Sequence, residues 1–221
     1  INLAADPERY QASAKLEWIT TGQRGYRHPG WHFFDDVKTK ETSAQQYEAT
    51  FTASKLGDKN IAMRALIPAG LDVEISQVKA PKAYGGSAPY NKKPLPTFLL
   101  RHQGEAWSNP YAVAYESITE GENYAVQSVE RILSNGVFKG VKVGINLNGK
   151  LLTQYILVQE NNEDRYHDKN LGIDFTGRFG IITLDAKEQP TEMYLGSGRY
   201  LQYKQHKVTP KPSNDNGYVK F

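Results

Sequence analysis

The sequence predicts an all-β protein that folds as an antiparallel β-sandwich, in one large or two small sandwich units, with little helix. Apolar and polar residues alternate with period two along most of the 221 residues, and no segment keeps a helical period over three turns. Turn-forming residues recur at intervals of roughly 8–12 residues, which is typical of a sandwich. Tyrosine accounts for 14 residues and methionine for 2, a balance that favours β structure.

The first half of the chain contains six expected strands, each bounded by turn or loop residues. A hairpin is expected around residues 56–60, Leu-Gly-Asp-Lys-Asn, because this run supplies turn chemistry between two alternating segments. Residues 80–96 are rich in Pro, Gly, Ser and Lys, which predicts a long surface loop. The strands are expected at residues 13–19, 47–53, 61–67, 73–78, 97–100 and 111–115.

The second half carries the strongest hairpin signals in the chain. Asn-Gly occurs at 135–136 and again at 148–149, and this pair suits a type I′ turn because both central residues need positive φ. Strands are expected at residues 124–133, 137–143, 151–158, 175–184, 192–195 and 199–204. These patterns predict a first sandwich region over 1–120, a C-terminal sandwich over 121–205 and a flexible tail over 206–221, with a single domain as the alternative.

Composition excludes several classes of function. A net charge of +3 and a pI of about 8.8 are too weak to indicate a nucleic-acid partner, and they are compatible with an acidic polysaccharide. The absence of cysteine excludes disulfides, thiol catalysis and Cys-type zinc sites. No apolar run approaches the roughly 18–20 residues of a membrane helix, so no membrane span is expected.

Two polar–aromatic clusters supply the candidate binding residues. Residues 101–107 place a guanidinium, an imidazole, a carboxylate and an indole between two expected strands, where loops commonly present side chains to ligands. In the second cluster, His28 and His32 lie four apart, but Pro29 and Gly30 between them argue against a helical metal pair. A structural role for this cluster is favoured over a metal site. The candidate substrate-binding residues are His28, Trp31, His32, Arg101, His102 and Trp107.

No cofactor and no metal ligand are assigned. The acidic run from Glu160 to Asp164 lacks the glycine-punctuated spacing of a calcium loop, so a solvated loop is favoured, with a structural cation as the alternative. The sequence contains neither a glycine-rich phosphate loop that opens a helix nor a Gly-x-Ser-x-Gly elbow. Nucleophilic catalysis therefore has no local support.

Several segments resemble the C-terminal β-sandwich region of the heparinase II/III-like polysaccharide lyases. The strongest resemblance lies in Pro-Thr-Phe-Leu-Leu-Arg at 96–101, Gln-Gly-Glu-Ala-Trp at 103–107 and Pro-Tyr at 110–111. Further similar segments are 28–34, 63–68 with Pro81, 127–129, 136–140 and 153–155. The resemblance spans most of residues 25–205 and implies that residues 1–120 are the last strands of a lyase-type sandwich.

The resemblance implies an enzyme that cleaves acidic, uronic-acid-containing polysaccharide by β-elimination, which needs carboxylate neutralisation, a base and an acid. In the family these groups lie on a helical toroid and early in the sandwich, and their motifs are absent here. No catalytic residue is therefore assigned. The chain, which starts at Ile1, is expected to be a fragment or processed piece, inert alone, that packs on the toroid of the same parent protein. A periplasmic or secreted bacterial location is implied.

Three other functions remain open. One is a stand-alone carbohydrate-binding sandwich, and another is an interaction domain that buries one sheet edge against a partner. The third is a complete small β-sandwich lyase that uses Arg101, His102, Gln103 and Tyr111. A regular strand would split residues 101–103 between two faces, which counts against this lyase.

Overall fold

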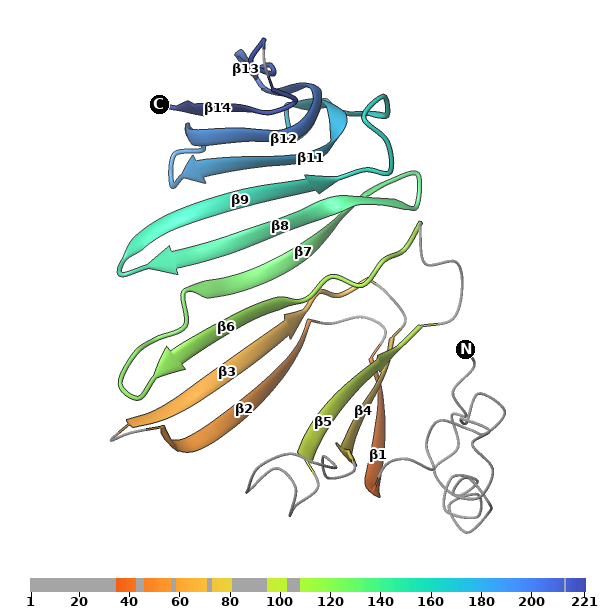
Figure 1. Ribbon diagram of the computed structural model, residues 1–221, viewed down its shortest axis with the longest axis vertical. Coiled ribbons are helices and arrows are strands. Elements are labelled where there is room, and N and C mark those ends of the chain that lie inside the picture. Colours follow the sequence, from red (N-terminus) through yellow and green to blue (C-terminus); the bar gives the residue numbers. More distant parts are fainter. Residues whose placement is uncertain are drawn as a thin grey trace. The chain divides into compact units, whose positions relative to one another are not determined.

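The structure is a computed structural model that describes residues 35–42, 46–56, 59–70, 73–80, 95–102, 108–212 and 214–221. Every regular element in these ranges is a β-strand and every strand pairing is antiparallel, so the predicted fold class is confirmed (Figure 1). The strands are β1 (Asp35–Thr42), β2 (Tyr47–Leu56), β3 (Lys59–Ile67), β4 (Val73–Ala80), β5 (Leu95–Arg101), β6 (Ala114–Thr119), β7 (Val126–Ser134), β8 (Val137–Leu147), β9 (Lys150–Val158), β10 (Arg165–Asp168), β11 (Ile173–Asp185), β12 (Pro190–Tyr203), β13 (His206–Val208) and β14 (Gly217–Lys220). The described residues include no helix able to span a membrane.

The chain divides into two compact units that interleave along the sequence. The first unit contains a three-stranded sheet with the order β1-β4-β5, in which Ile75 and Val78 of the central strand are buried. The second unit contains β2, β3 and all strands from β6 onward. The sequence predicts a boundary near residue 120, whereas the structure groups residues 44–71 with the C-terminal strands. This grouping depends on the pairing of strands far apart in the chain, such as β3 with β6, which composition does not indicate.

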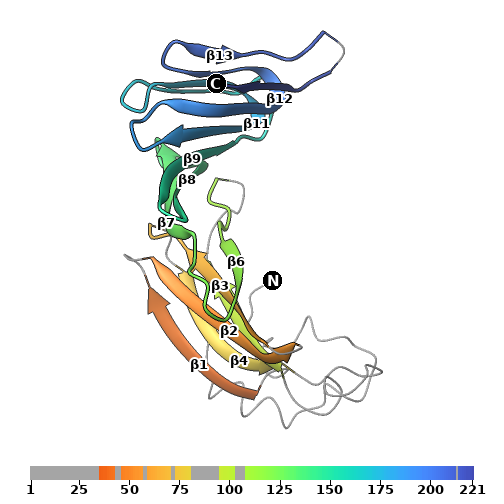
Figure 2. The same cartoon turned by 90° about the vertical axis from the view of Figure 1, so that its left-hand side faces the viewer.

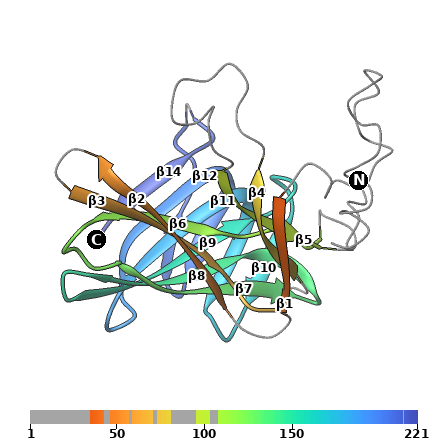
Figure 3. The same cartoon turned by 90° about the horizontal axis from the view of Figure 1, so that it is seen from below.

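A small sheet with the order β2-β3-β6 covers part of the large sheet in the second unit. Strand alternation puts Arg64 and Leu66 of β3 on the same face, and Leu66 packs in a buried cluster with Val129 of β7 and Val143 of β8. Ile156 of β9 borders this cluster. Figures 1 and 3 show β6 beside β7, where the two sheets meet. Leu66 of the small sheet is therefore buried against the outer face of β7 and β8.

The large sheet has eight strands, and its order runs β13-β12-β11-β9-β8-β7. Its two longest strands each have two partners on one side. β11 pairs with β9 along one half and with β10 along the other, and β12 pairs with β14 and β13 in the same way. Figure 2 shows β13, β12, β11 and β9 in the order of the sheet. Each long strand therefore takes part in both halves of the sheet.

Both long strands bend where Gly177 of β11 faces Gly198 of β12. The register shifts on each side of this pair, which marks it as a bulged region. Burial also changes phase there. Ile173 and Phe175 are buried before the bend, and Ile182 and Leu184 are buried after it, an odd number of residues further on. The bend allows both halves of the sheet to contribute to one core, whose buried residues are Ile132, Tyr155, Leu157, Tyr166, Ile173, Phe175, Ile182, Leu184, Met193, Leu195, Leu201, Tyr203 and Val208.

Both Asn-Gly hairpins form as predicted. The φ angles are +50° at Asn135 and +78° at Gly136, and they are +53° at Asn148 and +87° at Gly149. Positive φ at both central residues is the signature of a type I′ turn, whose twist matches that of the flanking strands. These turns set the register of β7 with β8 and of β8 with β9.

Several details differ from the expected elements. The segments 192–195 and 199–204 belong to one continuous strand, β12. The segment 206–221, expected to be a flexible tail, contains β13 and β14, because each finds unpaired backbone groups along β12. β1 and β10 were not expected. The expected strand at 13–19 and most of the expected loop at 80–96 lie outside the described residues.

Candidate functional site

The structure describes two of the six candidate residues, Arg101 and His102. Arg101 ends β5 and lies opposite Glu74 of β4 in the strand register, and His102 follows directly. Both side chains are half-buried in the first unit. His28, Trp31, His32 and Trp107 lie outside the described residues, so their binding roles stay predictions.

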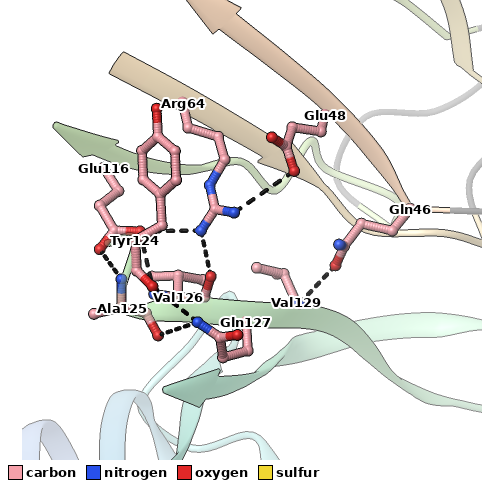
Figure 4. Close-up of polar contacts among 9 residues, drawn as sticks. All are labelled: Gln46, Glu48, Arg64, Glu116, Tyr124, Ala125, Val126, Gln127 and Val129. Carbon is pink, nitrogen blue, oxygen red and sulfur yellow. Dashed lines mark hydrogen bonds and ion pairs between the residues drawn. The ribbon is translucent and has the colours of Figure 1, made fainter. Parts of the chain in front are cut away.

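A depression of about 440 Å³ lies beside β7 in the second unit. On one side, Gln46 accepts a hydrogen bond at its Oε1 from the Val129 backbone N–H, at 2.9 Å (Figure 4). This bond joins the segment that enters β2 to the middle of β7. The residues that line the depression are Gln46, Ala69, Gly70, Val129, Glu130, Arg131 and Leu133.

Arg131 is the distinctive residue of this depression. Its Nη1 donates to the Pro110 carbonyl oxygen at 2.9 Å, and its Nη2 donates to Asn109 Oδ1 at 3.3 Å. The guanidinium lies 4.7 Å from the centre of the Phe138 ring. Burial lowers the pKa of Arg131. Among the described residues no carboxylate pairs with it, so this partly desolvated cation has only neutral partners.

An anion placed in the depression would therefore gain more from Arg131 than from a surface cation, since water screens the guanidinium less there. Glu130, the acidic residue of the lining, is 3.5 Å from the Lys142 Nζ, which offsets its charge. The arrangement suits recognition of a carboxylate or a sulfate. Neither composition nor spacing in the sequence reveals this arrangement. Arg131 is one of 27 cationic residues, and what matters is that it is partly buried with no carboxylate partner among the described residues.

Arg64 of β3 shows the opposite arrangement in the same unit (Figure 4). Its Nη2 donates to Glu116 Oε2 at 3.1 Å and to the Val126 carbonyl oxygen, and its Nη1 lies 3.6 Å from Glu48 Oε2. The Tyr124 ring centre is 4.0 Å from the guanidinium carbon. Glu116 in turn accepts the Ala125 and Val126 N–H groups, at 2.5 Å and 3.1 Å. Arg64 is thus compensated by carboxylates and joins β3, β6 and the start of β7.

The buried tyrosines do not supply a catalytic base. Burial raises the pKa of the Tyr155 and Tyr166 phenols, and the Tyr166 hydroxyl donates to Asp168 Oδ2 at 3.2 Å within the core. Both phenols therefore stay protonated at neutral pH.

Asp174 is fixed as a carboxylate on the outer face of β11. Arg165 donates to it through Nε at 2.9 Å and Nη2 at 2.7 Å, and Tyr200 donates at 2.9 Å. The hydrogen bonds from Arg165 lower the pKa of Asp174. A carboxylate held in this way is a weak base, so the cluster does not support proton abstraction.

The loop after β9 is tied to its neighbours through polar contacts. Asn162 accepts a hydrogen bond from Ser197 Oγ at 2.8 Å, and Glu163 pairs with Arg199. Gln159 donates to the Asp164 carbonyl oxygen at 2.8 Å. No group of three or more His, Asp or Glu residues suited to a metal ion occurs in the described ranges. A cation near Glu160 to Asp164 stays a prediction.

Comparison with known proteins identifies a family that is similar to the C-terminal part of the chain. Residues 126–221 match the family described as the endo-acting ulvan lyase C-terminal domain. An endo-acting ulvan lyase from Formosa agariphila (strain DSM 15362 / KCTC 12365 / LMG 23005 / KMM 3901 / M-2Alg 35-1) is 31% identical over 175 residues, which cover 79% of this chain and 21% of that protein. No solved structure matches.

The chain thus spans about a fifth of the length of the curated relative it matches. The family match covers β7 to β14, the whole of the eight-stranded sheet, and this includes Arg131 and the bend at Gly177 and Gly198. The coarser sequence prediction, the C-terminal β region of a polysaccharide lyase, is supported at this level. Over residues 126–221, the chain is similar to the C-terminal domain of endo-acting ulvan lyases.

Proposed function

We propose that this chain is the C-terminal β region of a polysaccharide lyase and that it binds acidic polysaccharide without catalysing its cleavage. Two findings support the proposal: the family match over the eight-stranded sheet, and a described surface that offers an unpaired cation but no acid–base set. The parent enzyme would act by β-elimination next to a uronic acid. The observation that carries the binding role is Arg131, a partly buried guanidinium with only neutral partners.

The finer family assignment is part of the same proposal. The segments at 96–101, 103–107 and 110–111 support a heparinase II/III-like lyase, in which a helical toroid carries most of the catalytic groups. The relative is much longer than the matched part and so has room for such a domain. We also propose that the parent protein is periplasmic or secreted in bacteria, where a polymeric substrate is accessible.

The isolated chain is expected to show no lyase activity. Incubation with ulvan, and separately with a polyuronate, should yield no rise in ultraviolet absorbance from unsaturated products, because the described residues provide no base near a bound sugar. An active ulvan lyase under the same conditions is the positive control. Turnover by the isolated chain would contradict the proposal and would favour the complete small lyase built on Arg101 and His102.

Arg131→Gln is expected to weaken binding of uronate oligosaccharides by about tenfold, since one charge-assisted contact contributes about 1.5–3 kcal/mol. Isothermal titration at two salt concentrations measures this loss. Because Arg131 also holds Pro110 and Asn109, a second variant is needed. Ala69→Phe places a large side chain in the depression and leaves residue 131 as arginine, and it should weaken binding as well. Lys187→Gln, which removes an exposed cation that does not line the depression, is the control and should change affinity little.

A stand-alone carbohydrate-binding module is the second candidate, favoured by the same unpaired cation. Both functions predict binding, so binding alone does not separate them. Addition of the chain to a parent lyase that lacks it does separate them. Restored activity on polymer supports the lyase component, whereas independent binding with no effect on the lyase supports the module.

A further inference from the structure

A second surface of the large sheet has the chemistry of a sugar-stacking platform. It lies on the outer face of β11, β12 and β14, which is the face opposite the core formed by Ile182, Met193 and Leu195. We define the tyrosine face as Phe179, Ile181, Tyr194 and Tyr218. The small sheet covers the corresponding face around Ile156 of β9, where the buried cluster with Leu66 lies. The tyrosine face belongs to the neighbouring strands, and its two tyrosines are exposed.

Tyr194 and Tyr218 form the centre of the tyrosine face. They are direct partners in the antiparallel register of β12 and β14, so their side chains leave the sheet side by side. Tyr194 is 37% exposed and Tyr218 is 50% exposed. No hydrogen bond joins either hydroxyl to another described residue. Two adjacent aromatic side chains with free hydroxyls are thus presented to the solvent.

Phe179 supports these side chains from β11. Its ring is 6.3 Å from the Tyr194 ring, with an interplanar angle of 72°, an edge-on contact. A Cβ at Gly196 would lie 2.5 Å from Phe179 Cδ1, so glycine there leaves room for the ring beside β12. This contact holds Tyr194 on one side and restricts its motion, which lowers the entropy lost when a ligand binds.

A row of polar side chains borders the tyrosine face along the strand direction. The register places Lys220 opposite Glu192, and Glu192 opposite Thr183. Lys220 Nζ lies 3.6 Å from Glu192 Oε1, and Gln154 donates to Thr183 Oγ1 at 3.2 Å. The Lys220 side chain is 71% exposed, and its ammonium has N–H donors besides the one directed at Glu192, which a ligand carboxylate or sulfate can accept. The surface therefore combines ring faces with a hydrogen-bonding and cationic border.

We propose that the tyrosine face binds acidic polysaccharide by stacking pyranose rings on Tyr194 and Tyr218, with the charged groups of the sugar toward Lys220. A pyranose has an apolar C–H face and a polar edge. The C–H face matches the exposed tyrosine rings, and the polar edge matches the polar side chains that border them. The inference rests on the proposed polysaccharide binding and adds a site separate from the Arg131 depression.

Tyr194→Ala and Tyr218→Ala are each expected to weaken binding of the chain to ulvan by about tenfold, the effect of one lost aromatic contact. Tyr194→Phe retains the ring and should bind within about twofold of wild type. Tyr115→Ala removes a tyrosine that is 66% exposed on β6 of the small sheet, and it should leave affinity unchanged. Affinity electrophoresis with ulvan, a polyuronate and neutral dextran measures these losses and tests the need for charge.

A second measurement uses the wild-type chain and so does not depend on whether the variants fold. Bound polysaccharide should slow the nitration of Tyr194 and Tyr218 by tetranitromethane and leave that of Tyr115 unaltered. Wild-type affinity in both alanine variants, or equal nitration with and without ligand, would overturn the tyrosine face but not the proposed function. A chain that binds neither polymer would overturn both. A concentration-dependent dimer that Tyr194→Ala abolishes would assign this face to a second copy and overturn the proposal.

Discussion

Gly198→Ala is expected to lower the free energy of unfolding of the large sheet by about 3 kcal/mol or more. A Cβ at this position would lie 2.5 Å from the Thr176 carbonyl oxygen and closer still to the Gly177 Cα, and both of these are backbone atoms. The φ angle of +146° is also unfavourable for alanine. Side-chain rotation cannot relieve such a clash, so β11 and β12 would have to separate at the bend.

Separation at the bend would reach the core directly. Phe175 and Leu201 are fully buried partners near the bend, and their packing depends on how closely the two strands approach. Urea unfolding followed by circular dichroism measures the loss. Gly149→Ala is the matched control, because its φ of +87° is also positive but no atom lies within 4 Å of the added Cβ. That variant should lose about 1 kcal/mol. Equal losses in the two variants would mean that the close approach at Gly198 adds nothing.

The Asn-Gly hairpins and the bend at Gly177 and Gly198 show which features of the fold can be predicted from local sequence patterns and which cannot. Asn148-Gly149 identifies its hairpin because a type I′ turn needs the two residues it contains and nothing distant. Gly196-Ser197-Gly198 reads locally as a turn, and it therefore divided β12 into two expected strands. In the structure these residues lie within one strand, because Gly177, about twenty residues earlier in the chain, is opposite Gly198 and allows the strands to meet closely. The sequence around Gly198 contains no local pattern that indicates its pairing with Gly177.

The Arg131 site could not be predicted from the sequence for a similar reason. Arg131 differs from Arg64 in having no carboxylate among its described partners, and this difference depends on contacts in three dimensions rather than on spacing in the sequence. Its neighbours nonetheless lie in segments that carried the family resemblance, since Pro110 and Phe138 both contact it. The Phe138 N–H also donates to the Ser108 carbonyl oxygen at 2.9 Å. These motifs thus mark a structural connection between residues 108–110 and the β7–β8 hairpin.

Arg64→Met is expected to lower the stability of the second unit by about 3 kcal/mol, near the lower end of the cost of breaking a buried ion pair. The side chains of Arg64 and Glu116 are 11% and 17% exposed, so water replaces the lost contact poorly. Glu116 keeps the Ala125 and Val126 N–H groups, which limits the loss, whereas the Val126 carbonyl oxygen loses its donor. Urea unfolding measures the change, and Glu48→Gln is the control. Glu48 is 49% exposed and lies 3.6 Å away, so its removal should cost less than 1 kcal/mol.

A double-mutant cycle with Glu116→Gln tests whether the ion pair itself joins the two sheets. Glu116 accepts two N–H groups just before and at the start of β7, and Arg64 donates to the carbonyl of the same strand. The two side chains thus act on one strand end from β3 and β6. If they act together, the double variant should lose at least about 1 kcal/mol less than the sum of the single losses. Additive losses would mean that each residue holds β7 separately, and the join would then depend on the buried cluster of Leu66, Val129 and Val143.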